Sequence, residues 1–251
     1  MGTITQDSPK CIAVVLGGKT LLQIQLETLR ASGISEISLV RGYCADKINY
    51  PGLRYYHNDS FANNNVLESL FHAEEELDTD LVVAYSDIWY GREIIERLCR
   101  CQHDIALAVD TNWKEEYVGR KEHPVTEAEN VVFDSNKRVI KIGKGVVEDG
   151  EDCAEFIGIM KLTARGGKIL RMHYHRAKEI FNGQRFQRAK TFQESYLTDL
   201  LQEMVGQGVP IHCENVDSDW REIDTAEDYQ KVVTILRERS NIKGNQTDPG
   251  I

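Results

Sequence analysis

The sequence predicts an α/β fold with a mostly parallel sheet covered by helices on both faces. Short aliphatic runs alternate with helical patterns along almost the whole chain, which is the order expected of parallel strands joined by helical crossovers. The 251 residues, 41% of them hydrophobic and 28% charged, suffice for the core of one large α/β domain or two small ones. Ligands of such sheets gather at the carboxyl ends of the strands, so functional residues are expected there.

The first two elements are a strand at residues 11–16 and a helix at residues 21–32. Leu22, Leu26 and Leu29 share one face of this helix, and the glycine that follows is a natural C-terminal stop. Apolar runs, an asparagine at a helix start and an asparagine-containing turn predict the remaining elements. In chain order we expect strands at 34–43 and 53–59, a helix at 63–77, a strand at 81–87, a helix at 91–102, a strand at 104–110, a hairpin at 130–143, a strand at 155–163, a helix at 191–208, a strand at 210–216 and a helix at 225–239.

Residues 17–20, Gly-Gly-Lys-Thr, raise the question of a Walker phosphate-binding loop. That loop requires Gly-x4-Gly-Lys-Ser/Thr, but Ala13 stands where the first glycine belongs, and residues 14–16 prefer a strand. A phosphate cradle needs small residues whose backbone amides converge on one anion. We therefore interpret the segment as a tight turn that joins a strand to a helix capped by Thr20.

Composition limits the compartment and the partners. The formal charge of −10 disfavours nucleic acid, although a few lysines or a divalent metal can still attract a nucleotide. The six cysteines form no zinc-binding pattern, and the sequence has neither a membrane-spanning apolar segment nor a signal-peptide core. We expect a cytoplasmic protein without nucleic-acid or membrane partners, a single domain at 1–238 and a disordered, polar tail at 239–251.

Segments spread over almost the whole chain, in the same order, resemble one family of enzymes. The matching stretches are 8–11, 16–34, 63–90, 109–117, 140–145, 154–163, 195–202 and 219–232. They resemble the nucleotidyltransferases that join a nucleoside triphosphate to a phosphorylated small molecule, and among them the cytidylyltransferases of phosphocholine and 2-aminoethylphosphonate. The resemblance implies a Rossmann-like nucleotidyltransferase (GT-A-like) fold, with a small β-rich lid around residues 120–160 and in the 200s.

The activity implied is Mg²⁺-dependent cytidylyl transfer from CTP to a small phosphorylated or phosphonylated alcohol or amine, with release of pyrophosphate. The family begins with a strand and a Gly-x-Gly-x-Arg loop, whereas residues 1–10 resemble only the tail of that loop. We therefore expect either an earlier natural start or a truncated relative with impaired catalysis. A sugar-1-phosphate uridylyl- or thymidylyltransferase and a non-catalytic binding module on the same fold are the alternatives, and a homodimer is left open.

Asp87 and Asp224 are the predicted metal ligands. Each stands at the end of a strand candidate, and each matches a metal-binding aspartate of the family. Carboxylate oxygens, water and substrate phosphates are the ligands that Mg²⁺ prefers, so Mg²⁺ is the expected cofactor. The alternatives are a turn residue for Asp87 and a helix cap for Asp224. Glu222 faces the same side of a short strand as Asp224 and is assigned to the substrate site.

Lys10 and Lys144 are the predicted catalytic lysines. Lys10 follows a proline and so leaves an extended segment, and the family's Pro-Lys lysine reaches the nucleotide phosphates. Lys144 stands near the family's second signature, where a basic residue meets the acceptor phosphate, although the residues after it differ here. Lys19 is expected to be solvated. For the nucleotide we expect Asn65, Ser69 and Ser86, with helix capping an equally good explanation of the asparagine.

The acceptor pocket is predicted from residue types within the matching motifs. A cationic head group such as an ammonium would be bound by a carboxylate and by aromatic faces. Packing is the alternative role for the tryptophans, and a solvated helix position for Asp199. Two histidines, His173 and His175, are expected on the surface of a polar helix. The predicted substrate-binding residues are Asp110, Trp113, Glu155, Tyr196, Asp199, Trp220 and Glu222.

Overall fold

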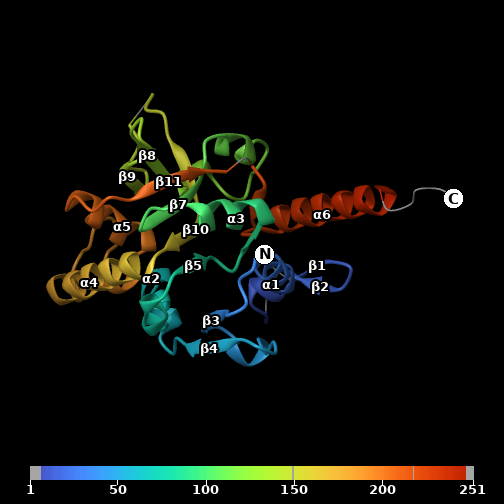
Figure 1. Ribbon diagram of the computed structural model, residues 1–251, viewed down its shortest axis with the longest axis horizontal. Helices are drawn as coiled ribbons and strands as arrows, with labels where there is room; N and C mark the ends of the chain where they lie inside the picture. The colour runs from blue at the N-terminus through green and yellow to red at the C-terminus, as the bar shows by residue number, and fades with distance from the viewer. Residues whose placement is uncertain (1–6, 149, 217, 247–251) are drawn as a thin grey trace.

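The computed structural model describes residues 7–148, 150–216 and 218–246, and its described part is built around a six-stranded sheet (Figure 1). The longest strand, β10 (Ala154–Leu162), is buried along its whole length. It pairs with β7 (Ile105–Asp110) on one edge and with β5 (Leu81–Ala84) and β8 (Glu129–Phe133) on the other. The sheet continues from β7 to β11 (His212–Asn215) and from β8 to β9 (Val139–Lys144).

Strand direction differs from the expectation of a mostly parallel sheet. Because β5 and β7 are both antiparallel to β10, and β11 is parallel to β7, these three strands run in one direction. However, β10 and the β8–β9 hairpin make most of the hydrogen-bonded pairs antiparallel. The α/β class is confirmed, but the prediction of a mostly parallel sheet was wrong. A strand that is buried on both faces has the same apolar composition whichever way it runs, so its sequence does not reveal its direction.

Three short two-stranded pairs lie outside this sheet. β3 (Ser38–Arg41) and β4 (Arg54–His57) pair in parallel, while β6 (Ile88–Tyr90) and β12 (Trp220–Glu222) pair antiparallel. β1 (Val14–Leu16) and β2 (Lys19–Thr20) form a small hairpin, and a 3-10 helix at Lys10–Ile12 replaces the start of the expected first strand.

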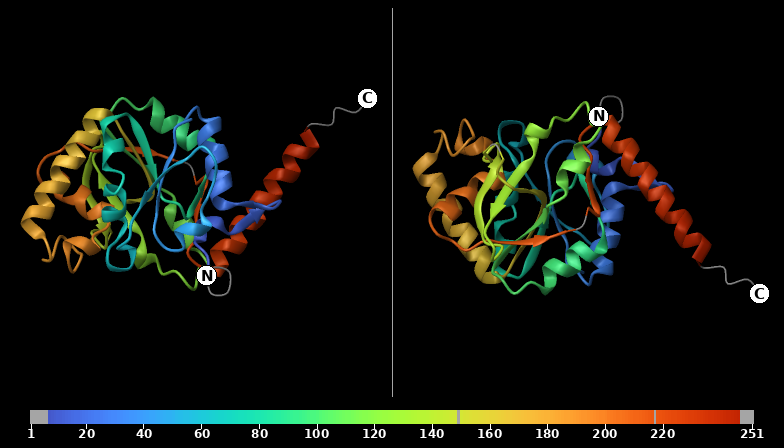
Figure 2. Two further views of the ribbon diagram at one scale, coloured as in Figure 1. Left: turned by 90° about the horizontal axis from the view of Figure 1, so that it is seen from below. Right: turned by 90° about the horizontal axis from the view of Figure 1, so that it is seen from above.

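Helices cover both faces of the sheet (Figure 2). Along β7, Ile105, Leu107 and Val109 pack with α2 (Val66–Phe71), α4 (Ala164–Phe181) and α5 (Leu197–Gly206). The alternate residues Ala106 and Ala108 pack with α3 (Arg92–Arg100). The period-two alternation of a strand thus gives two apolar clusters, one on each side of the sheet.

The glycine turn before α1 (Leu21–Ala31) is the predicted turn and helix cap. Gly17 and Gly18 have φ values of 52° and 81°, which favour glycine. The Thr20 hydroxyl accepts from the Gln23 amide at 3.2 Å, and the Gln23 side chain accepts from the Thr20 amide at 2.8 Å. The hydroxyl and amide of Thr20 are therefore occupied by this capping box and are not available to bind a phosphate, as they would be in a Walker loop.

Other differences concern boundaries and burial. α6 (Ala226–Gln246) continues as a helix where a disordered tail was expected from residue 239, and residues 247–251 lie outside the described part. His173 is buried, not on the surface, whereas His175 is exposed. No described helix is both long and apolar enough to cross a membrane. Further 3-10 helices are Ala45–Lys47, Phe61–Asn63, Glu74–Asp78, Trp113–Tyr117, Val125–Glu127 and Phe192–Glu194.

Candidate active site

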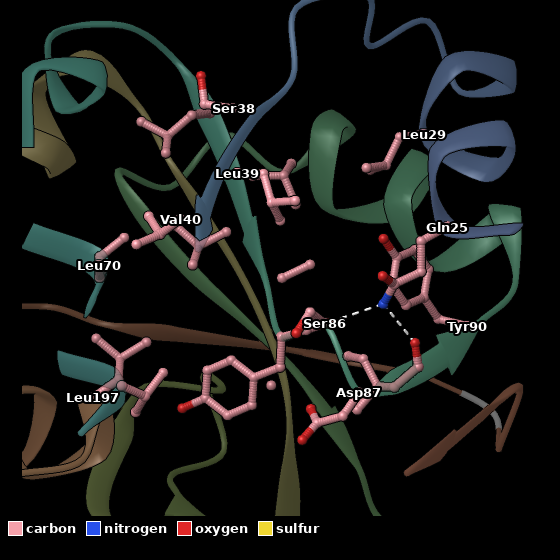
Figure 3. A pocket seen from close by; sticks show the side chains of 18 of the residues that line it. Gln25, Leu29, Ser38, Leu39, Val40, Leu70, Ser86, Asp87, Tyr90 and Leu197 are labelled. Atoms are coloured by element: carbon pink, nitrogen blue, oxygen red, sulfur yellow. Dashed lines mark hydrogen bonds between the residues drawn. The ribbon is translucent and has the colours of Figure 1, made fainter. Parts of the chain in front are cut away.

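A cavity of about 1560 Å³ opens at the carboxyl end of β5 and extends between β5 and β3 (Figure 3). One end is polar and one is apolar. The polar end is formed by side chains that follow β5 and β12 and by the β8–β9 hairpin, which is the β-rich segment predicted as a lid. The predicted site residues that line the cavity are Asn65, Ser69, Ser86, Asp87, Lys144, Glu155, Tyr196, Trp220, Glu222 and Asp224.

The two predicted metal ligands meet at Lys10. Its ammonium donates a hydrogen bond to Asp224 Oδ1 and lies 3.7 Å from Asp87 Oδ2. The two aspartates follow separate strands, β5 and β12, and are 137 positions apart by their numbers. A metal cation bound between these two carboxylates would neutralise the same negative charge that the Lys10 ammonium neutralises here.

The turn before α6 leaves the Asp224 carboxylate free for this contact. Asp228, which is buried, accepts from the Thr225 amide at 2.9 Å and from the Asp224 amide at 3.2 Å. The Thr225 hydroxyl in turn accepts from the Asp228 amide at 3.1 Å. Thr225 and Asp228 therefore cap the helix, and Asp224 does not, which removes the capping alternative for that residue.

Lys10 shapes the ionisation of its neighbours. Burial raises the pKa of Asp87 above its usual range, and Lys10 only partly offsets this effect. For Asp224 burial would also raise the pKa, but the hydrogen bond and charge of Lys10 outweigh it and lower the pKa. For Lys10 itself, burial is outweighed by the Asp224 hydrogen bond and the Asp87 charge, so its pKa is raised. The lysine stays charged, as a site for phosphates requires.

His123 and Glu222 complete the acidic cluster. His123 Nδ1 lies 3.1 Å from Asp224 Oδ2, and its Nε2 lies 3.7 Å from Glu222 Oε2. One ligand atom from each of these three residues falls within 4.8 Å of the others. Burial, with the nearby Asp224 charge, raises the pKa of Glu222 to about 9, and burial lowers that of His123. The carboxylate oxygens of Asp87 and Asp224 suit Mg²⁺, and the imidazole adds a donor that transition metals prefer.

Glu155 and Glu129 line the cavity on the sheet side. Tyr117 donates a hydrogen bond of 2.6 Å to Glu155 Oε1, while Glu155 Oε2 is buried without a hydrogen-bond partner among the described residues. Burial raises the pKa of Glu155 to about 8 and that of Glu129 to about 7, although Thr198 donates a hydrogen bond to Glu129. Buried carboxyls with raised pKa values are typical of functional sites.

Lys144 stands at the end of β9, above the aromatic ring of Tyr196. Its ammonium lies 4.4 Å from the ring centroid and 2.9 Å from Glu127 Oε2. Burial alone would lower the Lys144 pKa, but the Glu127 hydrogen bond and the charges of the neighbouring Tyr196, Glu127 and Glu129 together outweigh burial and raise the pKa. The pair presents a positive charge and an aromatic face to the cavity.

The predicted nucleotide residues lie along α2 and after β5. Asn65 caps α2 by accepting from the Val66 amide at 2.8 Å, which is the alternative that the sequence left open. Ser69 is held by Asn58, whose side-chain amide donates to the hydroxyl at 2.9 Å. Ser86 is exposed beside Asp87 (Figure 3).

Three predicted substrate residues are not in the cavity lining of the described chain. Asp110 is fully buried and accepts from the Trp220 indole at 2.9 Å. Trp113 is buried and donates to the Cys153 carbonyl at 3.0 Å. Asp199 accepts from the Tyr196 amide at 2.9 Å and caps α5. Their contacts are structural and stabilise the walls of the cavity.

His123, Glu129 and Arg120 are site residues that the sequence did not reveal. Arg120 pairs with Asp228 at 2.8 Å and lies 3.6 Å from Glu222. All three lie between β7 and β9, in the segment predicted only as a lid. Their partners are remote in sequence, so no local spacing marks them.

Known proteins share both the sequence pattern and the fold. A family model described as a MobA-like NTP transferase domain matches residues 1–146. The chain is 26% identical over 239 residues to the CTP:phosphoglutamine cytidylyltransferase of Campylobacter jejuni, covering 90% of this chain and 92% of that protein. It is 32% identical over 84 residues to the choline-phosphate cytidylyltransferase of Streptococcus pneumoniae, covering 32% of this chain and 36% of that protein.

Solved structures agree at the level of the fold. The CTP:phosphocholine cytidylyltransferase of Streptococcus pneumoniae has a TM-score of 0.70 at 18% identity, covering 94% of this chain and 93% of that chain. The inositol-1-phosphate CTP transferase of T. maritima has a TM-score of 0.67, also at 18% identity, covering 94% and 90%. With the family match extending over more than half of the sequence, the chain belongs to the MobA-like NTP transferase domain family and is a nucleotidyltransferase.

Proposed function

We propose that the protein transfers a cytidylyl group from CTP to a small phosphorylated or phosphonylated acceptor that carries an amine or a related polar head group, with release of pyrophosphate. The observation that carries the proposal is the meeting of Lys10, Asp87 and Asp224 at one end of the cavity. The long match to a CTP-using relative favours CTP over the other nucleotides. We propose that this activity belongs to one domain that acts in the cytoplasm, where its six free thiols would stay reduced.

The reaction needs charge neutralisation and positioning more than acid–base catalysis. An acceptor phosphate or phosphonate oxygen attacks the α-phosphorus of CTP, and the bond from that phosphorus to the pyrophosphate oxygen breaks. Lys10 would bind the triphosphate and offset its negative charge, and Lys144 would bind the acceptor phosphate. Asp87 and Asp224 would hold Mg²⁺, which when bound neutralises charge on the transferring phosphoryl group.

The remaining lining favours an acceptor with a polar or cationic head. Glu155, Glu129 and Glu222 place three carboxyl groups around the cavity, and the rings of Tyr196 and Trp220 add aromatic faces. The unpaired Glu155 Oε2 is a buried polar atom that a hydrogen-bonding head group would satisfy. A hexose would instead need many neutral hydroxyl partners, so we rank a sugar-1-phosphate uridylyl- or thymidylyltransferase second.

A pyrophosphate-release assay tests the proposal directly. CTP, UTP, dTTP, ATP and GTP are each combined with phosphoglutamine, phosphocholine, 2-aminoethylphosphonate and hexose-1-phosphates, with and without Mg²⁺. We expect release with CTP, Mg²⁺ and one of the three nitrogen-bearing acceptors. Release only with a hexose-1-phosphate would support the second candidate, and absence of release with every pair would favour a binding module.

Site variants then test the residues. Asp87→Asn and Asp224→Asn should each lower kcat at least about a hundredfold, since each removes a charged metal ligand. Asp59→Asn is the matched control, because the Asp59 side chain is 87% exposed and pairs only with His57 among the described residues. Retained activity in both site variants would reject the metal assignment.

A further inference from the structure

The two carboxylate oxygens of Asp224 contact different neighbours. Oδ1 accepts the hydrogen bond from Lys10, which also lies beside Asp87, whereas Oδ2 lies 3.1 Å from His123 Nδ1. The Mg²⁺ proposed between Asp87 and Asp224 would use the Oδ1 side. Since a carboxylate can bind one cation through each of its oxygens, Oδ2 and His123 are left for a separate site.

His123, Glu222 and Asp224 bring three potential metal-ligand atoms close together. One ligand atom from each residue lies within 4.8 Å of the others, and His123 Nε2 is 3.7 Å from Glu222 Oε2. Ligand atoms around an ion bound at about 2.1 Å are about 3–4 Å apart, so small side-chain rotations would let all three bind one ion. A metal-bound histidine uses one ring nitrogen and donates a hydrogen bond from the other, often to a carboxylate. These carboxylates can serve both purposes.

Among the described residues, Glu222 has no basic partner within hydrogen-bonding distance. Arg120 and His123 Nε2 lie 3.6 Å and 3.7 Å from its Oε2, and Arg120 is already bound to Asp228 through contacts of 2.8 Å and 2.9 Å. The Glu222 and Asp224 carboxyl groups also lie within hydrogen-bonding reach of each other. Two carboxylates this close repel each other unless a proton or a cation lies between them. A bound cation would therefore neutralise charge that the protein leaves unpaired here.

The segment that carries His123 is fixed to the first turn of α6. Arg120, three residues earlier, pairs with the buried Asp228 at 2.8 Å, and Asp228 also accepts from the Asp224 amide at 3.2 Å. One helical turn therefore positions both the histidine segment and Asp224. The His123 side chain is only 12% exposed. Ligands held in this way by surrounding contacts are the rule in metal sites, because outer contacts fix their orientation.

We propose that His123, Glu222 and Asp224 form a second divalent-cation site, selective for a first-row transition-metal ion, beside the Mg²⁺ site proposed for Asp87 and Asp224. The selectivity follows from the imidazole, since Mg²⁺ prefers oxygen ligands whereas transition metals bind nitrogen well. The ion would connect the segment between β7 and β8 to the end of β12, and it would face the cavity, which all three residues line. The inference rests on the proposed function only through Asp224, which both sites share.

Binding of Mn²⁺ to the full chain, followed by electron paramagnetic resonance without nucleotide, tests the proposal. The spectrum of free Mn²⁺ weakens as the ion binds, so a titration gives the number of sites and their affinities. Spin-echo modulation from an imidazole nitrogen reports whether a histidine is a ligand. We expect a bound Mn²⁺ with imidazole modulation, which a roughly tenfold excess of Mg²⁺ does not displace.

Variants identify the ligands. His123→Ala should abolish the imidazole modulation and weaken Mn²⁺ binding at this site at least about tenfold, and Glu222→Gln, which keeps the side-chain shape, should weaken it by a similar factor. Asp87→Asn should keep the modulation, because Asp87 belongs only to the other site. His175→Ala is the matched control, since His175 also lies beside a carboxylate, that of Glu74, but is 53% exposed on α4. Circular dichroism would confirm that each variant keeps its fold.

Two outcomes would overturn the proposal. Bound Mn²⁺ without imidazole modulation in the wild type would show that His123 only makes a hydrogen bond to Asp224. Loss of the modulation in Asp87→Asn would show that the whole cluster holds one shared ion and not two. None of these readouts uses CTP, so the two proposals can fail separately. Pyrophosphate release without the modulation would reject only the second site, and the modulation without pyrophosphate release would reject only the proposed reaction.

Discussion

Replacing Glu155 with glutamine should change how the stability of the protein depends on pH. Glu155 is 4% exposed, and burial raises its pKa from 4.5 to about 8. The folded protein therefore keeps this proton over a range in which the unfolded chain has lost it. Because the folded state then binds more protons, the free energy of unfolding falls as the pH rises from about 4.5 to about 8.

The magnitude follows from the two pKa values. At about 1.4 kcal/mol per pH unit, the full effect of this carboxyl is about 5 kcal/mol, most of it developed between pH 5 and pH 8. Glutamine has the same shape, accepts from Tyr117 as Glu155 does, and cannot ionise. We expect Glu155→Gln to gain about 3–4 kcal/mol over the wild type between pH 5 and pH 8, on top of a constant offset.

Urea unfolding at pH 5, 6, 7, 8 and 9 measures this difference. Glu129 and Glu222 also have raised pKa values. Both interact electrostatically with Glu155, but they remain in both proteins, so most of their contribution cancels in the difference. Glu148→Gln is the matched control, because the Glu148 side chain is 85% exposed. Parallel stability curves for the wild type and Glu155→Gln would refute the claim that burial holds this carboxyl neutral.

Three further predictions concern the scaffold and the cation. Arg120→Met leaves the buried carboxylate of Asp228 unpaired and should lower the free energy of unfolding by about 3–5 kcal/mol, measured by urea unfolding. Thr20→Ala removes the cap of α1 and should cost about 1 kcal/mol in the same assay, with Thr20→Ser largely preserving stability. Removing metal with EDTA should abolish pyrophosphate release, and restored Mg²⁺ should return it in the wild type but not in Asp224→Asn; release that EDTA does not affect would contradict the metal assignment.

The sequence identified the part of the site that is written in local motifs. Asp87 follows the apolar run of β5, whereas Asp224 follows the mixed segment Trp-Arg-Glu-Ile at residues 220–223 and was predicted from its match to a family motif. Lys10 is marked by the proline before it. The structure brings these residues together, and similar reasoning predicted Thr20 as the cap of α1 and the β8–β9 hairpin.

The other contacts of the candidate site could not be predicted, because they join residues that are distant in sequence. Asp110 and Asp199 are acidic residues in matching motifs, but one accepts from the Trp220 indole and the other caps a helix, and neither partner is visible in the motif. His123 belongs to the candidate site because its imidazole contacts the carboxylate of Asp224, about a hundred residues away in the sequence. The direction of β10 could not be predicted either, because the apolar content of a strand does not depend on the direction in which it runs. Composition suggested a disordered tail, yet α6 continues through much of that segment.

The first turn of α6 has a practical consequence for protein engineering. Asp228 ties this turn both to Asp224 and to Arg120, so any change that unwinds the helix here would displace Asp224, the proposed metal ligand. The other end of α6 is far away, since 21 helical residues span about 31 Å, and it projects from the body (Figure 1). The buried side chains of Val232, Val233 and Leu236 separate the two ends. An affinity tag or a fused reporter at the outer end of α6 would therefore lie far from the candidate active site and should not disturb it.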